Sequence, residues 1–164
     1  MGERVGLAEA LNERRAEILE RWLQVLLGTY PAETARFLTG VADPFGNPVG
    51  QTLRAGVDRL YDALVGGHGP DAMAAAADGI VRIRAVQEFP PSVAVGFALA
   101  LRPILREELA GAALADAERA ALDDAVDRMA LAAFDVYMQC REKIFEIRVR
   151  ELRDARRMAE RLGA

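Results

Sequence analysis

The sequence has few of the residues from which catalytic and metal sites are built. Its 164 residues include one histidine, His68, and one cysteine, Cys140. His68 lies in the glycine-rich segment 66–70, so it cannot anchor a His-based triad, a metal site or an axial haem bond. Cys140 has no second cysteine with which to form a disulfide or redox pair. The sequence therefore predicts no catalytic residue, no metal and no cofactor.

Long hydrophobic runs are also absent. No apolar stretch approaches the roughly 20 residues needed to cross a bilayer. The chain opens with charged residues in the segment 1–4 and shows no apolar core of a signal peptide. Together with the lone cysteine, this pattern predicts a soluble cytoplasmic protein without membrane insertion.

Acidic residues outnumber basic residues except near the end of the chain. The formal net charge is −4, yet residues 141–164 hold 8 basic and 5 acidic side chains. The two signs are interleaved there, which is typical of a solvated helix face. The rest of the chain is acidic, whereas a nucleic-acid-binding domain normally carries a basic face. We expect no nucleic-acid partner.

Strand patterns are nearly missing, and the composition is 52% hydrophobic and rich in alanine. This favours an all-α fold, a single helical bundle comprising residues 1–164. The expected core spans about 6–145. Expected helices span 6–27, 32–38, 51–65, 71–86 and 91–109. The segment 40–50 is expected to be an irregular loop, with Phe45 as a hydrophobic plug against the core and Asn47 as a turn or cap residue or a pocket lip.

The stretch from Asp116 to Leu162 contains no glycine and no proline. An unbroken helix of this length would run about 70 Å. A compact domain of this size is only about 40 Å across. The helix must therefore break, or its end must project and pair as a coiled coil. We expect residues 146–162 to form a signalling or dimerisation helix in a homodimer. The predicted seam consists of Tyr137, Cys140, Ile144, Phe145, Leu152 and Ala155.

A few charged residues stand in apolar surroundings. Arg82 and Arg84 lie in a nearly uncharged helix, and Asp135 stands among large apolar residues. A buried charge needs a partner, so ion pairs such as Arg84–Asp135 or Arg82–Glu142 would lock helices together. Alternatively, one arginine faces a cavity and receives a small polar or anionic ligand.

The same residues carry a resemblance to a known family. The blocks that carry it are EILERW (17–22), TYP (29–31), DPFGNPVG (43–50), RIRAVQEFPPS (82–92) and FDVYMQCREK (134–143). Across about 14–155 the chain resembles the RsbRD-type N-terminal domain, the sensory domain named after a co-antagonist of the RsbT kinase in the bacterial stressosome. The family occurs alone and at the N-terminus of sensor kinases and stressosome proteins. The resemblance therefore leads us to expect either a stand-alone member or an excised input domain.

The resemblance implies a non-catalytic signal-input domain whose output, a histidine kinase or a stressosome protein, follows the last helix. Related input domains are globin-like without haem, so a non-haem globin-like bundle is expected by analogy. No ligand comes with the resemblance. From the residues, the expected ligand-binding set is Arg82, Arg84, Gln87, Asp135, Asn47 and Arg141. The alternative is a dimerisation or protein-interaction module without a small-molecule ligand.

Overall fold

The computed structural model describes residues 6–40 and 45–163. Every regular element in these two ranges is an α-helix, which confirms the all-α class. In chain order the helices are α1 (Leu7–Glu13), α2 (Arg15–Leu27), α3 (Ala32–Gly40), α4 (Pro48–Val65), α5 (Pro70–Val86), α6 (Pro91–Glu108) and α7 (Asp116–Leu162). Within the same ranges, no helix is both long and apolar enough to cross a membrane.

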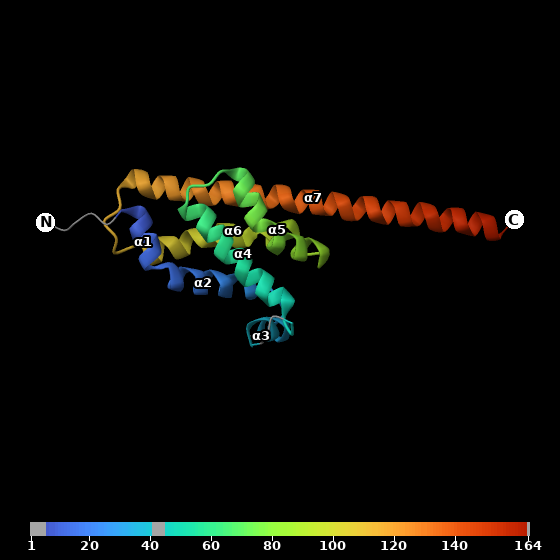
Figure 1. Cartoon of the computed structure of the whole chain (residues 1–164), viewed down its shortest axis with the longest axis horizontal. Coiled ribbons are helices and arrows are strands. Elements are labelled where there is room, and N and C mark those ends of the chain that lie inside the picture. The colour runs from blue at the N-terminus through green and yellow to red at the C-terminus, as the bar shows by residue number, and fades with distance from the viewer. Residues whose placement is uncertain (1–5, 41–44, 164) are drawn as a thin grey trace.

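The helices form a body from which the end of α7 projects (Figure 1). Within the body α7 packs against α5 and α6, and α5 packs in turn against α4. On the other side of the body, α2 contacts both α6 and α4. The short α3 lies at the edge of the body, where it contacts α2 and α4. The body is therefore a helical bundle in which α7 is the longest member.

The last helix is continuous over 47 residues, Asp116–Leu162, which is the stretch without glycine and proline. The Glu118 side chain accepts a hydrogen bond from the Ala115 amide and so caps the first turn. The last buried residue of α7 is Cys140, and every described residue from Arg150 onward is exposed. Of the two predicted alternatives, the helix projects and does not break. Its final turns, residues 146–162, form a rod about 25 Å long.

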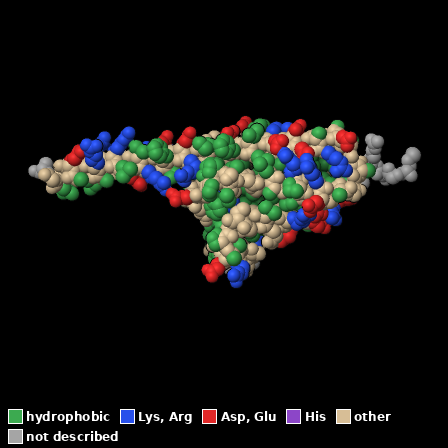
Figure 2. All heavy atoms as spheres, turned by 180° about the vertical axis from the view of Figure 1, so that it is seen from behind, with side chains coloured by type: hydrophobic (Ala, Val, Ile, Leu, Met, Phe, Trp, Pro, Cys, Tyr) green, Lys and Arg blue, Asp and Glu red, His purple; other side chains and the backbone are tan. Residues whose placement is uncertain are grey.

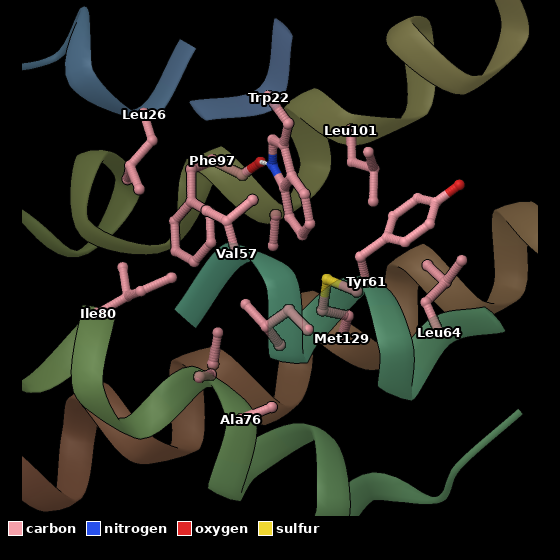
Figure 3. Packing of buried hydrophobic residues seen from close by; sticks show 14 of the residues in the cluster. Trp22, Leu26, Val57, Tyr61, Leu64, Ala76, Ile80, Phe97, Leu101 and Met129 are labelled. Carbon is pink, nitrogen blue, oxygen red and sulfur yellow. Dashed lines mark hydrogen bonds between the residues drawn. The ribbon is translucent and has the colours of Figure 1, made fainter. Parts of the chain in front are cut away.

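The core lies where α2, α4, α5, α6 and α7 meet (Figure 3). Trp22 is fully buried, and its indole N–H donates to the Phe97 carbonyl at 2.7 Å. Its ring stacks on that of Phe97, with centroids 6.1 Å apart. Gly56 of α4 lets Ile80 of α5 approach, because a Cβ at Gly56 would lie 2.5 Å from an Ile80 carbon. These contacts give the body a single packed interior.

The predicted first helix, 6–27, is interrupted at Arg14, where α1 ends and α2 begins. The buried Tyr61 hydroxyl donates to the Leu11 carbonyl at 2.8 Å. In a continuous helix this carbonyl would accept the Arg15 amide. Burial also raises the pKa of Tyr61 to about 12, so its hydroxyl keeps its proton. A tertiary hydrogen bond thus accompanies a break that the local sequence does not signal.

The prediction for the loop 40–50 is wrong at both ends. α3 extends to Gly40, and α4 already begins at Pro48, where a first-turn proline is tolerated. Residues 41–44 of the predicted loop lie outside the described ranges. Phe45 is 95% exposed, so it does not plug the core. Leu38 of α3 and Leu53 of α4, which precede and follow this segment in the chain, are both buried in the core.

Candidate functional site at the junction of α5, α6 and α7

A tight corner joins α5 to α6 beside the point where α7 leaves the body. The Phe89 amide donates to the Arg84 carbonyl, and the Glu88 amide donates to the Ala85 carbonyl. This pair of bonds is the Schellman arrangement that ends many helices. Glu88 occupies the left-handed position with φ 62°, where glycine is usual. Pro90 and Pro91 then start α6, so the corner is fixed from both sides.

Arg84 is fully buried at the base of this corner. Its Nε donates to the Ala94 carbonyl at 3.1 Å, and its Nη2 donates to the Val93 carbonyl at 2.7 Å and to Thr29 Oγ1 at 2.9 Å. The guanidinium carbon also lies 4.4 Å from the centre of the Phe89 ring. Burial lowers the pKa of Arg84. The side chain therefore joins the ends of α2, α5 and α6 through backbone carbonyls and a hydroxyl.

The two predicted ion pairs do not form. Asp135 lies on the exposed face of α7, away from the buried Arg84. Arg82 points outward and pairs with Asp78, one helical turn earlier, at 2.8 Å. Glu142 is likewise exposed. The prediction failed because an arginine can be buried on carbonyl and hydroxyl acceptors and aromatic faces without a carboxylate.

Three side chains of α7 bind this corner. The Tyr137 hydroxyl donates to the Phe89 carbonyl at 2.6 Å. Arg141 donates to the Ala85 carbonyl at 3.4 Å, and Arg148 forms an ion pair with Glu88 at 2.6 Å. The hydrogen bond from Arg148 lowers the pKa of the Glu88 carboxyl. The corner thus holds α7 over three turns, from the buried part of the helix to the start of the rod.

The corner is also connected to the end of α2. Tyr30 packs edge-on against Phe89, with ring centroids 5.0 Å apart, and its hydroxyl donates to the Gln87 Oε1 at 3.1 Å. Burial raises the pKa of Tyr30. Arg84 also donates a hydrogen bond to Thr29 in the α2–α3 turn. One contiguous network therefore connects this turn, the corner and α7. A displacement of any one of these segments would therefore change the contacts of the other two.

Only part of the predicted ligand-binding set meets here. Arg84, Gln87 and Arg141 belong to the network, whereas Arg82 and Asp135 face solvent. Asn47 is a cap, as one of its two predicted roles states: its Oδ1 accepts the Gly50 amide and its Nδ2 donates to the Leu38 carbonyl, both at 2.9 Å. Tyr30 and Glu88 were not among the predicted site residues. Glu88 stands directly before Phe89-Pro90-Pro91, and that position signals a helix end but not a link to α7.

Comparison with known proteins supports the resemblance carried by these blocks. Residues 16–152 match the RsbT co-antagonist protein rsbRD N-terminal domain. The chain belongs to this family. An uncharacterised protein of Archaeoglobus fulgidus is 31% identical over 142 residues, which cover 84% of this chain and 83% of that protein. No solved structure matches the chain.

Membership places the chain among stressosome-related signalling domains, which are regulatory and not catalytic. The match to the RsbRD N-terminal domain includes the corner, the whole buried part of α7 and the start of the rod. The network around Glu88 and Arg84 therefore lies within the part of the chain that defines the family. The haem-free globin-like comparison made from the sequence stays a prediction.

The predicted seam of this RsbRD N-terminal domain divides into two groups. Tyr137 and Cys140 are buried within the body, so they are not accessible to a second copy. Burial also raises the pKa of the Cys140 thiol, which favours an inert, protonated sulfur. Ile144 is half-buried, while Phe145, Leu152 and Ala155 are exposed. Helical periodicity identified the apolar positions but could not show which face the body covers.

Proposed function

We propose that this RsbRD N-terminal domain is a non-catalytic cytoplasmic input domain that pairs with a second copy through α7 and passes a signal along that helix. The output would be a kinase or a stressosome protein. One observation carries the proposal: apolar residues at heptad spacing remain exposed along α7, from the body to the end of the rod. An exposed apolar stripe on a helix is stabilised when another helix covers it.

We call these residues the α7 stripe. Its members occupy two positions of a seven-residue repeat. The first position recurs from Leu131 to Ala159, and the second, three residues after the first, recurs from Phe134 to Leu162. Its members are Leu131, Phe134, Met138, Phe145, Leu152, Ala155, Ala159 and Leu162. Phe145 and Leu152 are about 70% exposed. Figure 2 shows hydrophobic side chains continuing from the body onto the projecting helix, between charged ones. Arg141 and Arg148 occupy the second heptad position where α7 instead contacts the corner.

The flanking positions favour a parallel pair. In a parallel coiled coil, the residue directly before the first heptad position faces the residue that lies five places later in the sequence of the partner helix. This rule places Glu151 opposite the second copy's Arg156, which has the opposite charge. It also places the half-buried Ile144 opposite Val149 of the second copy. Parallel pairing sends both rods in one direction, which transmission to a shared output requires.

The junction would couple the body to the rod. Tyr137, Arg141 and Arg148 fix α7 to the corner, so a change in the corner shifts or rotates the helix. A rotation of paired helices by a fraction of a turn changes which residues meet at the seam. This gives the proposed domain a physical route from input to output.

Two alternatives concern the input. A small polar or anionic ligand at Arg84 is favoured by one observation: among the residues that the structure describes, no hydrogen-bond acceptor reaches its buried Nη1. The other alternative is an interaction module without a ligand. Native mass spectrometry of the purified protein separates them, because a dimer with added mass indicates a bound ligand and a dimer without it favours the interaction module.

Light scattering tests the pairing itself. Phe145→Glu or Leu152→Glu places a charge in the stripe, whereas Ile147→Glu is the matched control on the same helix. Ile147 is 45% exposed but lies on the side of α7 away from the stripe. We expect the wild type and Ile147→Glu to be dimers and both stripe variants to be monomers at the same concentration. A monomeric wild type at high micromolar concentration would contradict the proposal.

A further inference from the structure

A pocket lies at the other end of α7, where α6 turns into α7. It has a volume of about 200 Å³. Its lining comes from the C-terminal half of α6, the linker after it and the first turns of α7: Leu105, Arg106, Leu109, Leu114, Arg119, Leu122 and Asp123. Figure 1 places this turn at the end of the body opposite the rod. The pocket is therefore separate from the α5–α6 corner and from the α7 stripe.

The floor of the pocket is apolar. Leu105 and Leu109 are 2% exposed, and Leu114 and Leu122 are 9% exposed. A dry cavity of about 150 Å³ can hold a molecule of the size of benzene, while drug-sized ligands need about 300 Å³ or more. The volume and the leucines thus fit an alkyl chain of roughly six to eight carbons.

The polar side of the pocket carries an excess of positive charge. Arg106 pairs with Asp123 at 2.7 Å, and Asp123 also contacts Arg102 at 3.3 Å. The half-buried Arg119 donates to the Ala112 carbonyl at 3.1 Å. Within residues 6–40 and 45–163, no carboxylate lies within ion-pair distance of Arg119. Its remaining N–H groups suit a planar carboxylate, which a guanidinium binds with two parallel hydrogen bonds.

We propose that this pocket binds a medium-chain alkyl carboxylate, with the chain against the four leucines and the carboxylate on Arg119. The proposal adds a binding site and a ligand class to the input domain, and it does not depend on pairing through α7. A ligand in this position contacts α6, the linker and α7 at once. Its binding would change how the first turns of α7 pack on the body.

Calorimetric titration with octanoate, below the concentration at which it forms micelles, tests the proposal directly. We expect saturable binding by the wild type, and a loss of affinity of about tenfold or more in Arg119→Gln, because a hydrogen-bonded charge pair is removed. Octanol should bind correspondingly more weakly than octanoate. Arg153→Gln, which changes an arginine on the rod, is the matched control and should bind octanoate as the wild type does.

A second measurement keeps the test valid if Arg119→Gln perturbs the linker. Methyl NMR spectra of the unmodified protein should show octanoate-dependent shifts at Leu105, Leu109, Leu114 and Leu122, and none at Leu152 on the rod. Any one of three results would overturn the proposal. They are no saturable binding of octanoate, equal affinity for octanol and octanoate, and NMR shifts that occur only at residues outside the pocket. None of these results bears on dimerisation, which light scattering measures independently.

Discussion

Arg84 illustrates how this fold accommodates a charged residue in its interior. Within residues 6–40 and 45–163 the guanidinium has no carboxylate partner, but it has three hydrogen-bond acceptors and two aromatic neighbours, Tyr30 and Phe89. Burial disfavours its charged form, as the lowered pKa shows. The side chain therefore costs desolvation energy, and in return it fills a large volume and joins three chain segments. Its contribution is measured best by comparing truncation with apolar replacement.

The first prediction compares three variants by chemical denaturation. Arg84→Ala removes a fully buried side chain and should lower the free energy of unfolding by about 3 kcal/mol. Arg84→Met keeps much of the volume without the charge and should cost clearly less. Arg82→Ala, on the same helix but exposed, should change stability by no more than about 0.5 kcal/mol. Equal stability of Arg84→Ala and the wild type would refute the structural role of Arg84.

The second prediction concerns Glu88, whose carboxyl pKa is lowered by the hydrogen bond from Arg148. Because the folded-state pKa is lowered, the pair stabilises the junction at any pH above the ordinary pKa of glutamate. This stabilisation is lost as the pH falls through the folded-state pKa. NMR titration of the side-chain carboxyls should find a higher Glu88 pKa in Arg148→Gln than in the wild type. Lys143→Gln, on the same helix, should leave it unchanged. An unchanged Glu88 pKa in Arg148→Gln would show that the pair does not form in solution.

At the scale of elements, the sequence indicated most helix ends and missed those set by tertiary contacts. Pro91 signalled the start of α6, whereas α5 begins at Pro70, one residue before the predicted start. The stretch without glycine and proline coincides with α7, although the sequence left open whether that helix breaks. The break at Arg14 accompanies a hydrogen bond to Tyr61, whose position is fifty residues from Leu11 in the sequence, and no local pattern reports such a contact. For the same reason, periodicity proposed Tyr137 and Cys140 for the seam, although α5 and the corner cover that face.

The third prediction tests the packing of α4 on α5. Gly56→Ala introduces a Cβ 2.5 Å from Ile80 and should lower the free energy of unfolding by about 1–3 kcal/mol, despite the higher helix propensity of alanine. Gly96→Ala in α6 is the matched control, because a Cβ there meets no other described atom within 4 Å apart from its chain neighbours and its own helix backbone. We expect this control to be stabilised by up to about 1 kcal/mol. A tolerated Gly56→Ala, measured by thermal unfolding, would show that α4 and α5 are not closely packed.

At the scale of the whole molecule, the structure consists of a helical body and one continuous helix, α7, that extends beyond it. The body buries the N-terminal half of α7, and the corner binds its middle. The α7 stripe runs from the body onto the rod, and no element within the described residues covers it. Pairing of two rods would cover this exposed apolar face, as we propose for a domain that transmits its signal through α7.

Cysteine cross-linking of the rod tests parallel pairing most directly. Leu152→Cys and Ala159→Cys would each be made separately with Cys140→Ala, so that the only thiol lies in the stripe. In a parallel, in-register pair identical stripe positions face each other within disulfide reach, so both variants should cross-link. Arg157→Cys, on the outer face of the rod, should not. An antiparallel pair can bring at most one of two positions seven residues apart to its own copy, and cross-linking of one or neither would contradict the account.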